Sequence, residues 1–183
     1  MDALPDLTPE HFEILVVREL RKVGLAVSEL RVHRRATLPE PQQGYLLELK
    51  GIVSGVGGQR RVLIACHRQA TPISRPGVES LQQHFKEAGV EAGLLFAAAD
   101  FEPEALSAAE DANVTLLRVT DGRAAFDTSG WGAQGHYPMW LPAYCAQAVV
   151  RGPSGQPRYQ LLAGGQQSLI VDQLTRIKER PTA

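Results

Sequence analysis

Two stretches of the sequence carry ionisable side chains that a pair of strands could direct to one face. Glu48 and Lys50 alternate with apolar residues in the stretch Tyr45–Val53, and in "RRVLIACHRQ", residues 60–69, an apolar run ends in His67. Alternate residues of a strand share a face, so the three side chains would meet if the two strands pair. Such a group can hold a divalent cation and activate a water, because hard cations prefer oxygen ligands and a nearby base accepts the proton.

The same residues also fit a structural interpretation, which the spacing alone favours. Glu48 and Lys50 would then form a solvated ion pair on a half-exposed strand. His67 would be a polar residue at the end of its strand.

Helix caps and hydrophobic periodicity predict the elements that position these residues. Thr8 as an N-cap and Pro9 at the first helical position predict a helix that ends at Gly24. Three strand-like segments follow, and the turn "SGVGGQ" joins the last two, which predicts an antiparallel meander. The segments are residues 26–32, 45–53 and 61–66.

The next part of the chain alternates between helices and buried strands. "SRPGVESLQQHFKEAG" and "EPEALSAAEDAN" read as helices, and "EAGLLFAAA" and "VTLLRVT" as strands that are apolar on both faces. Strands separated by helices predict parallel pairing. The predicted fold class is therefore α/β, a mixed β-sheet flanked by helices.

Residues 127–183 differ in composition from residues 1–126, and we interpret them as a C-terminal extension of the main domain. The extension is rich in Gly, Pro and aromatic residues, and it is predicted to contain a β-hairpin and a terminal helix, "QSLIVDQLTRIKER". The aromatic residues from Trp131 to Tyr144 would either clamp the extension onto the domain or form an interface with a protein partner or a second copy. The clamp is the favoured use.

Composition limits the classes of function. The 183 residues carry 19 basic and 20 acidic side chains, a net charge of −1, so any contact with DNA must be local. The sequence shows neither a signal core nor an apolar run of about 18 residues, which predicts a cytoplasmic protein without a membrane segment. The two cysteines lack the spacing of a zinc site or a disulfide framework, so no metal site is predicted from them.

The order of elements and several local motifs resemble the Mrr-like branch of the restriction endonuclease-like, PD-(D/E)XK nuclease superfamily. The resemblance covers about residues 8–122 and includes the Phe12-Glu13 pair, the Arg75-Pro76-x-Val78 start of the second helix, and "FAAADFEPEALSAA". It implies a restriction endonuclease-like mixed β-sheet flanked by helices. The hairpin-plus-helix extension lies outside it.

The catalytic pattern of that family is largely missing. The family has Gly-x-Asp at the start of its second strand and Gln-x-Lys or Glu-x-Lys at the end of its third; the oxygens hold magnesium and the lysine orients or activates water. The resemblance places Gly44-Tyr45-Leu46 and Ala65-Cys66-His67 on these motifs, so only the glycine matches. Leu46 and Ala65 offer no side-chain oxygen to a hard cation, and His67 replaces the lysine by a weaker base.

Three functions follow as hypotheses. The first is a catalytically degenerate protein that binds DNA or acts as a scaffold, without a cofactor. The second is an active Mg²⁺-dependent endonuclease with a displaced site formed by Glu13, which matches the family's helix glutamate, together with Glu48 and His67. The third is a protein–protein interaction module. For DNA binding, the candidate phosphate contacts are Arg34, Arg35, Arg60, Arg61, Arg68 and Arg75.

Overall fold

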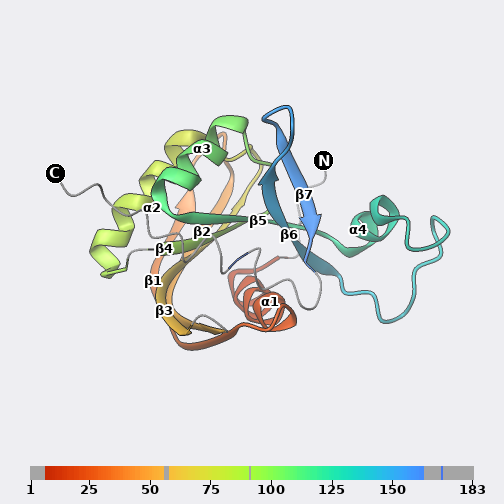
Figure 1. Cartoon of the computed structure of the whole chain (residues 1–183), viewed down its shortest axis with the longest axis horizontal. Coiled ribbons are helices and arrows are strands. Elements are labelled where there is room, and N and C mark those ends of the chain that lie inside the picture. Colours follow the sequence, from red (N-terminus) through yellow and green to blue (C-terminus); the bar gives the residue numbers. More distant parts are fainter. Residues whose placement is uncertain (1–6, 56–57, 91, 163–169, 171–183) are drawn as a thin grey trace.

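The computed structural model describes residues 7–55, 58–90, 92–162 and Ile170. Its central element is a seven-stranded mixed sheet (Figure 1). The strands lie in chain order, and β3, β4 and β5 run parallel while the other neighbours pair antiparallel. The predicted mixed sheet, with its meander and parallel layer, is confirmed. The strands are β1 (Ala26–Leu38), β2 (Gly44–Gly55), β3 (Gly58–Gln69), β4 (Ala92–Ala97), β5 (Val114–Asp121), β6 (Tyr144–Arg151) and β7 (Pro157–Leu161).

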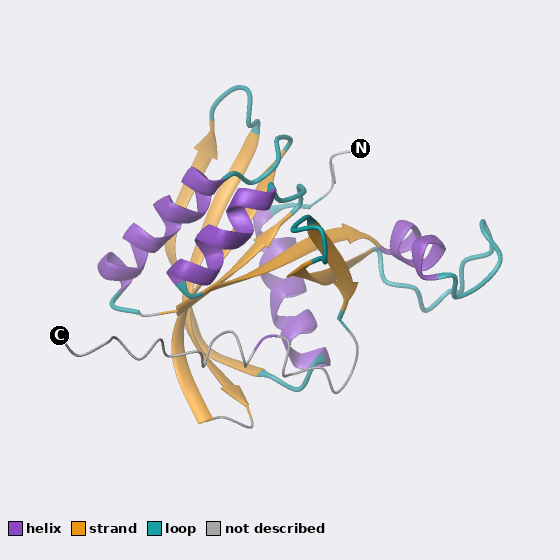
Figure 2. Ribbon diagram, turned by 45° about the horizontal axis from the view of Figure 1, so that its top comes forward, coloured by secondary structure: helices purple, strands orange, loops and turns teal. Residues whose placement is uncertain are grey.

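Helices cover both faces of the sheet (Figure 2). Helix α1 (Pro9–Lys22) packs on one face, and α2 (Arg75–Ala88) and α3 (Pro103–Ala112) pack side by side on the other. Strand β3 serves both cores because its side chains alternate: Ile64 and Cys66 belong to the α1 core, whereas Leu63 and Ala65 belong to the core under α2 and α3. We call these two sides the α1 face and the α2 face.

The predicted N-cap of α1 is confirmed, whereas its C-cap is Val23, one residue before the predicted Gly24. The Thr8 side chain accepts a hydrogen bond of 3.2 Å from the His11 amide, and α1 ends at Lys22 with Val23 as its C-cap. Helix α2 ends at Gly89, which adopts the left-handed conformation that glycine allows without strain. Both helices then present an apolar stripe to the sheet, as their periodicity predicts.

The extension is continuous with the sheet. Strands β6 and β7 form the predicted hairpin, and β6 pairs with β5. Helix α4 (Gly122–Ser129) was not predicted and spans residue 127, where we placed the boundary of the extension; the division into a domain and an extension stays a prediction. The predicted terminal helix lies outside the described residues except for Ile170, which is buried in the α1 core.

The aromatic part of the extension follows α4 and extends away from the sheet (Figure 1). Phe126 makes edge-to-face contacts with Trp131 and Tyr137, with ring centroids 6.0 and 5.8 Å apart, so part of the aromatic set clamps the segment onto α4. Met139 and Trp140 do not join this clamp, because they are 104% and 72% exposed.

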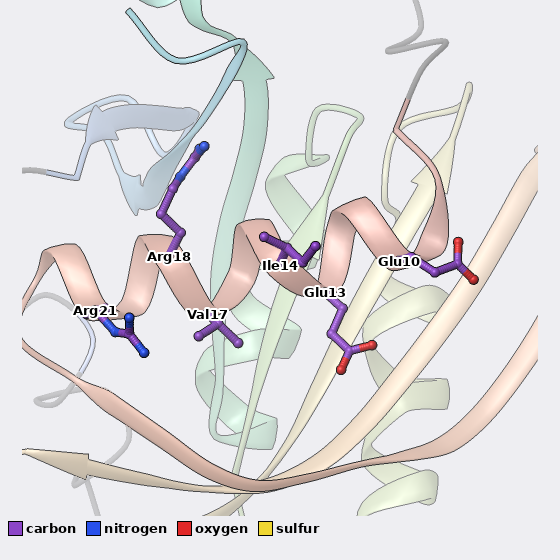
Figure 3. Close-up of a pocket in the computed structure, with 6 residues that line it drawn as sticks. All are labelled: Glu10, Glu13, Ile14, Val17, Arg18 and Arg21. Carbon is purple, nitrogen blue, oxygen red and sulfur yellow. The ribbon is translucent and has the colours of Figure 1, made fainter. Parts of the chain in front are cut away.

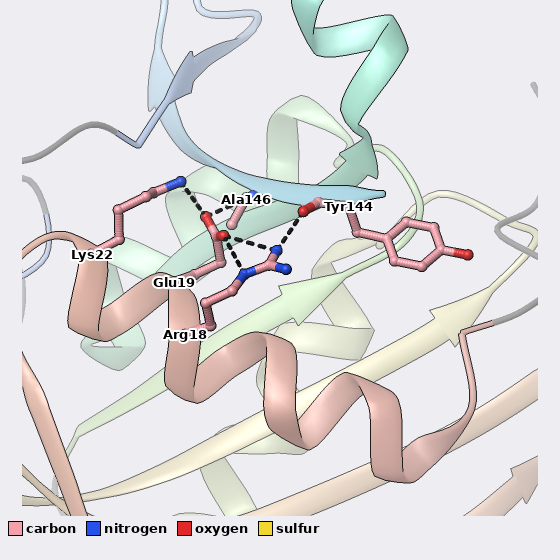
Figure 4. A network of polar contacts seen from close by, with 5 residues as sticks. All are labelled: Arg18, Glu19, Lys22, Tyr144 and Ala146. Atoms are coloured by element: carbon pink, nitrogen blue, oxygen red, sulfur yellow. Dashed lines mark hydrogen bonds and ion pairs between the residues drawn. The ribbon is translucent and has the colours of Figure 1, made fainter. Parts of the chain in front are cut away.

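A buried carboxylate joins α1 to the extension (Figure 4). Glu19 is 1% exposed, lies 2.6 Å from the Lys22 ammonium, and accepts a hydrogen bond of 3.1 Å from the backbone amide of Ala146 in β6. Arg18 contacts Glu19 and also donates to the Tyr144 carbonyl. The network therefore attaches the first helix to a strand more than 120 residues later in the chain.

None of the helices in the described residues is long and apolar enough to cross a membrane.

Candidate functional site at the β2–β3 strand pair

The residues that the resemblance places on the family's catalytic motifs lie on one face of the β2–β3 pair. Leu46 is the Cα partner of His67, and Glu48 is the partner of Ala65. Directly opposed residues of an antiparallel pair point the same way, and Ala65 packs in the core under α2. The four side chains therefore share the α2 face, as the alternation predicts.

Gly44, which matches the family's first motif, has a structural role here. Its φ is +142°, and a Cβ atom at this position would lie 1.8 Å from the carbonyl oxygen of Arg68 on β3. Only glycine fits so close an approach of two backbones. This requirement explains the glycine at position 44 in structural terms.

Glu48 lies at the centre of a buried polar cluster. Its side chain is 1% exposed, and carboxylate Oε1 lies 2.5 Å from Nδ1 of His84 on α2. Oε2 lies 3.6 Å from Nε of Arg34, an ion-pair distance that is too long for a hydrogen bond. Arg34 also pairs with Glu87 at 2.7 Å. The carboxylate is thus held by a histidine from a helix and an arginine from the neighbouring strand.

His67 lies beside this cluster without completing it. The ring is 9% exposed, and its Nε2 atom is buried without a hydrogen-bond partner in the described part of the chain. The pKa of His67 is lowered to about 4, chiefly by burial and secondarily by the neighbouring His84, whereas the Gln69 side chain acts in the opposite direction. At neutral pH the ring is therefore uncharged.

The structure does not bring Glu13 together with Glu48 and His67, as the displaced site requires. Glu13 projects from α1, and the nearby thiol of Cys66, whose pKa is raised by burial and secondarily by Glu13, belongs to the α1 core. The sheet separates this carboxylate from Glu48 and His67, because consecutive residues of β3 point to opposite faces.

Glu13 instead lines a pocket of about 530 Å³ along α1 (Figure 3). The described residues that line it all come from α1, and they include the exposed Ile14. This pocket is separate from the motif strands. The lining residues are Glu10, Glu13, Ile14, Val17, Arg18 and Arg21.

The arginines that were predicted to contact phosphates do not lie together on one part of the surface. Arg34 lies beside Glu48, whereas Arg60 and Arg61 lie near the opposite end of the β2–β3 hairpin, as partners of Val53 and Ile52. Several of these arginines have acidic partners: Arg34 pairs with Glu48 and Glu87, Arg35 with Glu10 at 3.5 Å, and Arg75 with Glu79 at 2.7 Å. Their role in DNA binding stays a prediction.

His84 and Arg118 were missed by the sequence analysis. His84 is a polar position of a helix, and the sequence carries no signal that it would lie beside Glu48. Arg118 lies near the carboxyl end of β5, pairs with Asp100 at 2.5 Å and stacks 3.6 Å above the ring of Tyr159. Its charge is satisfied within the molecule, so it contributes to structure rather than to an open site.

The residues at the motif positions do not fit a magnesium ion. Leu46 and Ala65 supply no oxygen, and the two oxygens of Glu48 face His84 and the cationic Arg34. Within the described residues, no group of three or more His, Cys, Asp or Glu side chains is arranged to hold a metal ion.

The order of helices and strands, with the motif positions on the second and third strands, defines a restriction endonuclease-like α/β fold. The restriction endonuclease family model of the Mrr catalytic domain matches residues 4–122, more than half of the chain, and the chain therefore belongs to this family. No curated protein matches the chain significantly, and no solved structure does.

Proposed function

We propose that this member of the restriction endonuclease family binds DNA but does not carry out metal-dependent cleavage. DNA is the substrate class that the family implies. The observation that carries the proposal is the environment of Glu48. It is the carboxylate of the motif strands, and both of its oxygens face groups of this protein that would have to move before a cation could bind.

The energetics of the cluster support this proposal. Removing one member of a buried ion pair leaves the other charge without compensation, which costs about 3–5 kcal/mol. A cation at Glu48 would have to displace both His84 and Arg34 from the carboxylate. A catalytic site instead needs oxygen ligands that are free to bind the metal, and a group that positions water.

The displaced nuclease site is not supported by the geometry. It needs Glu13, Glu48 and His67 around one metal, but Glu13 lies on the other face of the sheet. The expected result is therefore no cleavage of supercoiled plasmid or of single-stranded DNA by the purified chain with Mg²⁺ or Mn²⁺. Binding of labelled duplex is expected in the same buffers.

A matched pair of variants tests the origin of any cleavage that is observed. Glu48→Gln removes the carboxylate of the cluster, and Glu87→Gln removes the exposed partner of the same arginine. Wild-type cleavage that is lost in Glu48→Gln and retained in Glu87→Gln, with both variants folded, would overturn the inactive assignment. Failure of the wild-type chain to bind duplex DNA at low salt would overturn the DNA-binding assignment.

Self-association is the second candidate function, and the exposure of Met139 and Trp140 favours it. Large apolar side chains that are exposed on the surface are typical anchors of protein interfaces. Light scattering at micromolar concentration, on the wild type and on Met139→Ser with Trp140→Ser, tests this function. A wild-type monomer would exclude a second copy as the partner.

A further inference from the structure

Three cationic side chains from three neighbouring strands lie together on the α2 face, towards the β2–β3 turn. Arg31 of β1 and Lys50 of β2 are Cα partners, so their side chains point the same way with Cβ atoms about 5 Å apart. Arg61 of β3, the partner of Ile52, is the diagonal neighbour of Lys50 on the same face. Long side chains can interact across such a diagonal. We call these three residues the basic cluster.

The basic cluster is exposed, and no acidic side chain pairs with it in the part of the chain that the structure describes. All three residues are exposed, and none of them takes part in an ion pair among the described residues. Glu91, which precedes β4, lies outside that part, so Arg31 and Lys50 carry the argument and Arg61 extends it. Arg34, by contrast, has two acidic partners only a short distance along β1.

Nearby acidic residues are either engaged or make no ion pair in the described structure. Glu48 lies two residues before Lys50 on the same face of β2, but its carboxylate is buried against His84 and Arg34. Glu29 is exposed, next to an irregularity in β1, and makes no ion pair among the described residues. Like charges placed directly opposite each other destabilise a sheet. The pair Arg31–Lys50 is therefore an arrangement that an external anion would stabilise.

The geometry points to a polyanion with regularly spaced charges. Three adjacent strands place the cations across two inter-strand spacings, about 10 Å in total. A nucleic-acid strand presents one phosphate per 3.4 Å or so of helix axis, so about three phosphates face a surface of that width. Arginine guanidinium groups suit phosphate oxygens because they donate paired hydrogen bonds, and lysine adds a point charge.

We propose that Arg31, Lys50 and Arg61 form a phosphate-contact site for the backbone of DNA, separate from the strand positions of the catalytic motifs. The inference rests on the DNA binding proposed above. It assigns the contacts to residues that were not singled out together in the sequence, and it leaves Arg34, Arg35 and Arg75 to their internal ion pairs.

The experiment measures duplex binding by fluorescence anisotropy between 50 and 300 mM salt. The full chain is compared with the triple variant Arg31→Gln, Lys50→Gln, Arg61→Gln. The expected result is a decrease of about 2–3 in the slope of log affinity against log salt concentration, since each lost phosphate contact removes about 0.9 from the slope. Affinity should also fall at least tenfold at 100 mM salt, equally for unrelated sequences, because phosphate contacts carry no sequence information.

A control variant removes the same total charge elsewhere: Arg123→Gln, Arg151→Gln, Arg158→Gln. It should keep the wild-type slope. The triple variant of the basic cluster should unfold at the same urea concentration as the wild type or a higher one, because it relieves the repulsion between Arg31 and Lys50. Lost binding would then not be explained by misfolding.

The outcomes separate this inference from the function on which it rests. Wild-type binding with an unchanged slope in the basic-cluster variant would overturn the inference and leave DNA binding in place. A wild type that binds no duplex would overturn both. A basic-cluster variant that loses binding to anionic vesicles but keeps its affinity for DNA would assign the cluster to another polyanion and overturn the assignment to DNA.

Discussion

Nδ1 of His84 on α2 lies 2.5 Å from carboxylate Oε1 of Glu48 on β2. When the carboxylate is ionised, Nδ1 carries the hydrogen and donates it, which sets the tautomer of the ring. The contact joins a helix to the strand that carries a catalytic motif in the family. Glu48, a candidate metal ligand in the sequence, therefore takes part in the packing between the helix and the sheet.

The first prediction concerns this contact. Glu48→Ala should lower the free energy of unfolding by about 3–5 kcal/mol, because it leaves His84 and Arg34 beside an empty, buried position. Urea denaturation followed by circular dichroism measures the change. Glu87→Ala is the matched control, since it removes an exposed partner of the same Arg34 and should cost less than about 1 kcal/mol. Equal losses in the two variants would contradict the central role of Glu48.

The second prediction concerns pH and His67. Its pKa is lowered from 6.5 to about 4, so between these values the unfolded chain binds a proton that the folded chain does not. Stability should therefore fall as pH decreases through this window, by up to about 3 kcal/mol from this residue. His67→Gln should make the dependence of unfolding free energy on pH shallower between pH 6.5 and 4. An equally steep dependence in the variant would assign the effect to other groups.

The third prediction concerns Glu19. Glu19→Ala should cost about 3 kcal/mol, because the amide of Ala146 loses its acceptor and two cations lose their shared partner. The Ala146 amide should also exchange its hydrogen faster in NMR experiments, which a general loss of helix α1 alone would not single out. Glu13→Ala, on the same helix, is the control and should cost about 0.5 kcal/mol or less. Unchanged protection of Ala146 would show that the network does not hold β6.

The fourth prediction concerns Gly44. Gly44→Ala should destabilise the fold by about 2–4 kcal/mol, because the new methyl group would overlap the Arg68 carbonyl and φ is positive. Gly77→Ala, in α2, meets only a side-chain contact at 3.7 Å and should be neutral or stabilising by up to about 1 kcal/mol. Thermal unfolding of both variants measures the difference. Tolerance of alanine at position 44 would mean that the β2–β3 pairing at this end differs from the one described.

The sequence was sufficient for the local features of this protein. Thr8 and Gly89 mark helix ends through their own conformational preferences, and the period of two along β2 places Glu48 and Lys50 on one face whatever packs against them. The sequence also shows directly that Leu46 and Ala65 cannot hold a metal ion, because their side chains carry no oxygen. Helix α4 was missed because its eight residues follow a strand without a long apolar stripe.

The tertiary structure alone decided which groups meet. Whether Glu13 or His84 reaches Glu48 depends on which helix covers which face of the sheet, and helix packing involves residues far apart in the chain. The same holds for the charges: Arg34 and Arg31 are three residues apart on β1, yet the first is neutralised by Glu48 and Glu87 while the second faces Lys50. Alternation is a local property of the backbone, whereas pairing between side chains is set by strand register and by the packing of the helices on the sheet.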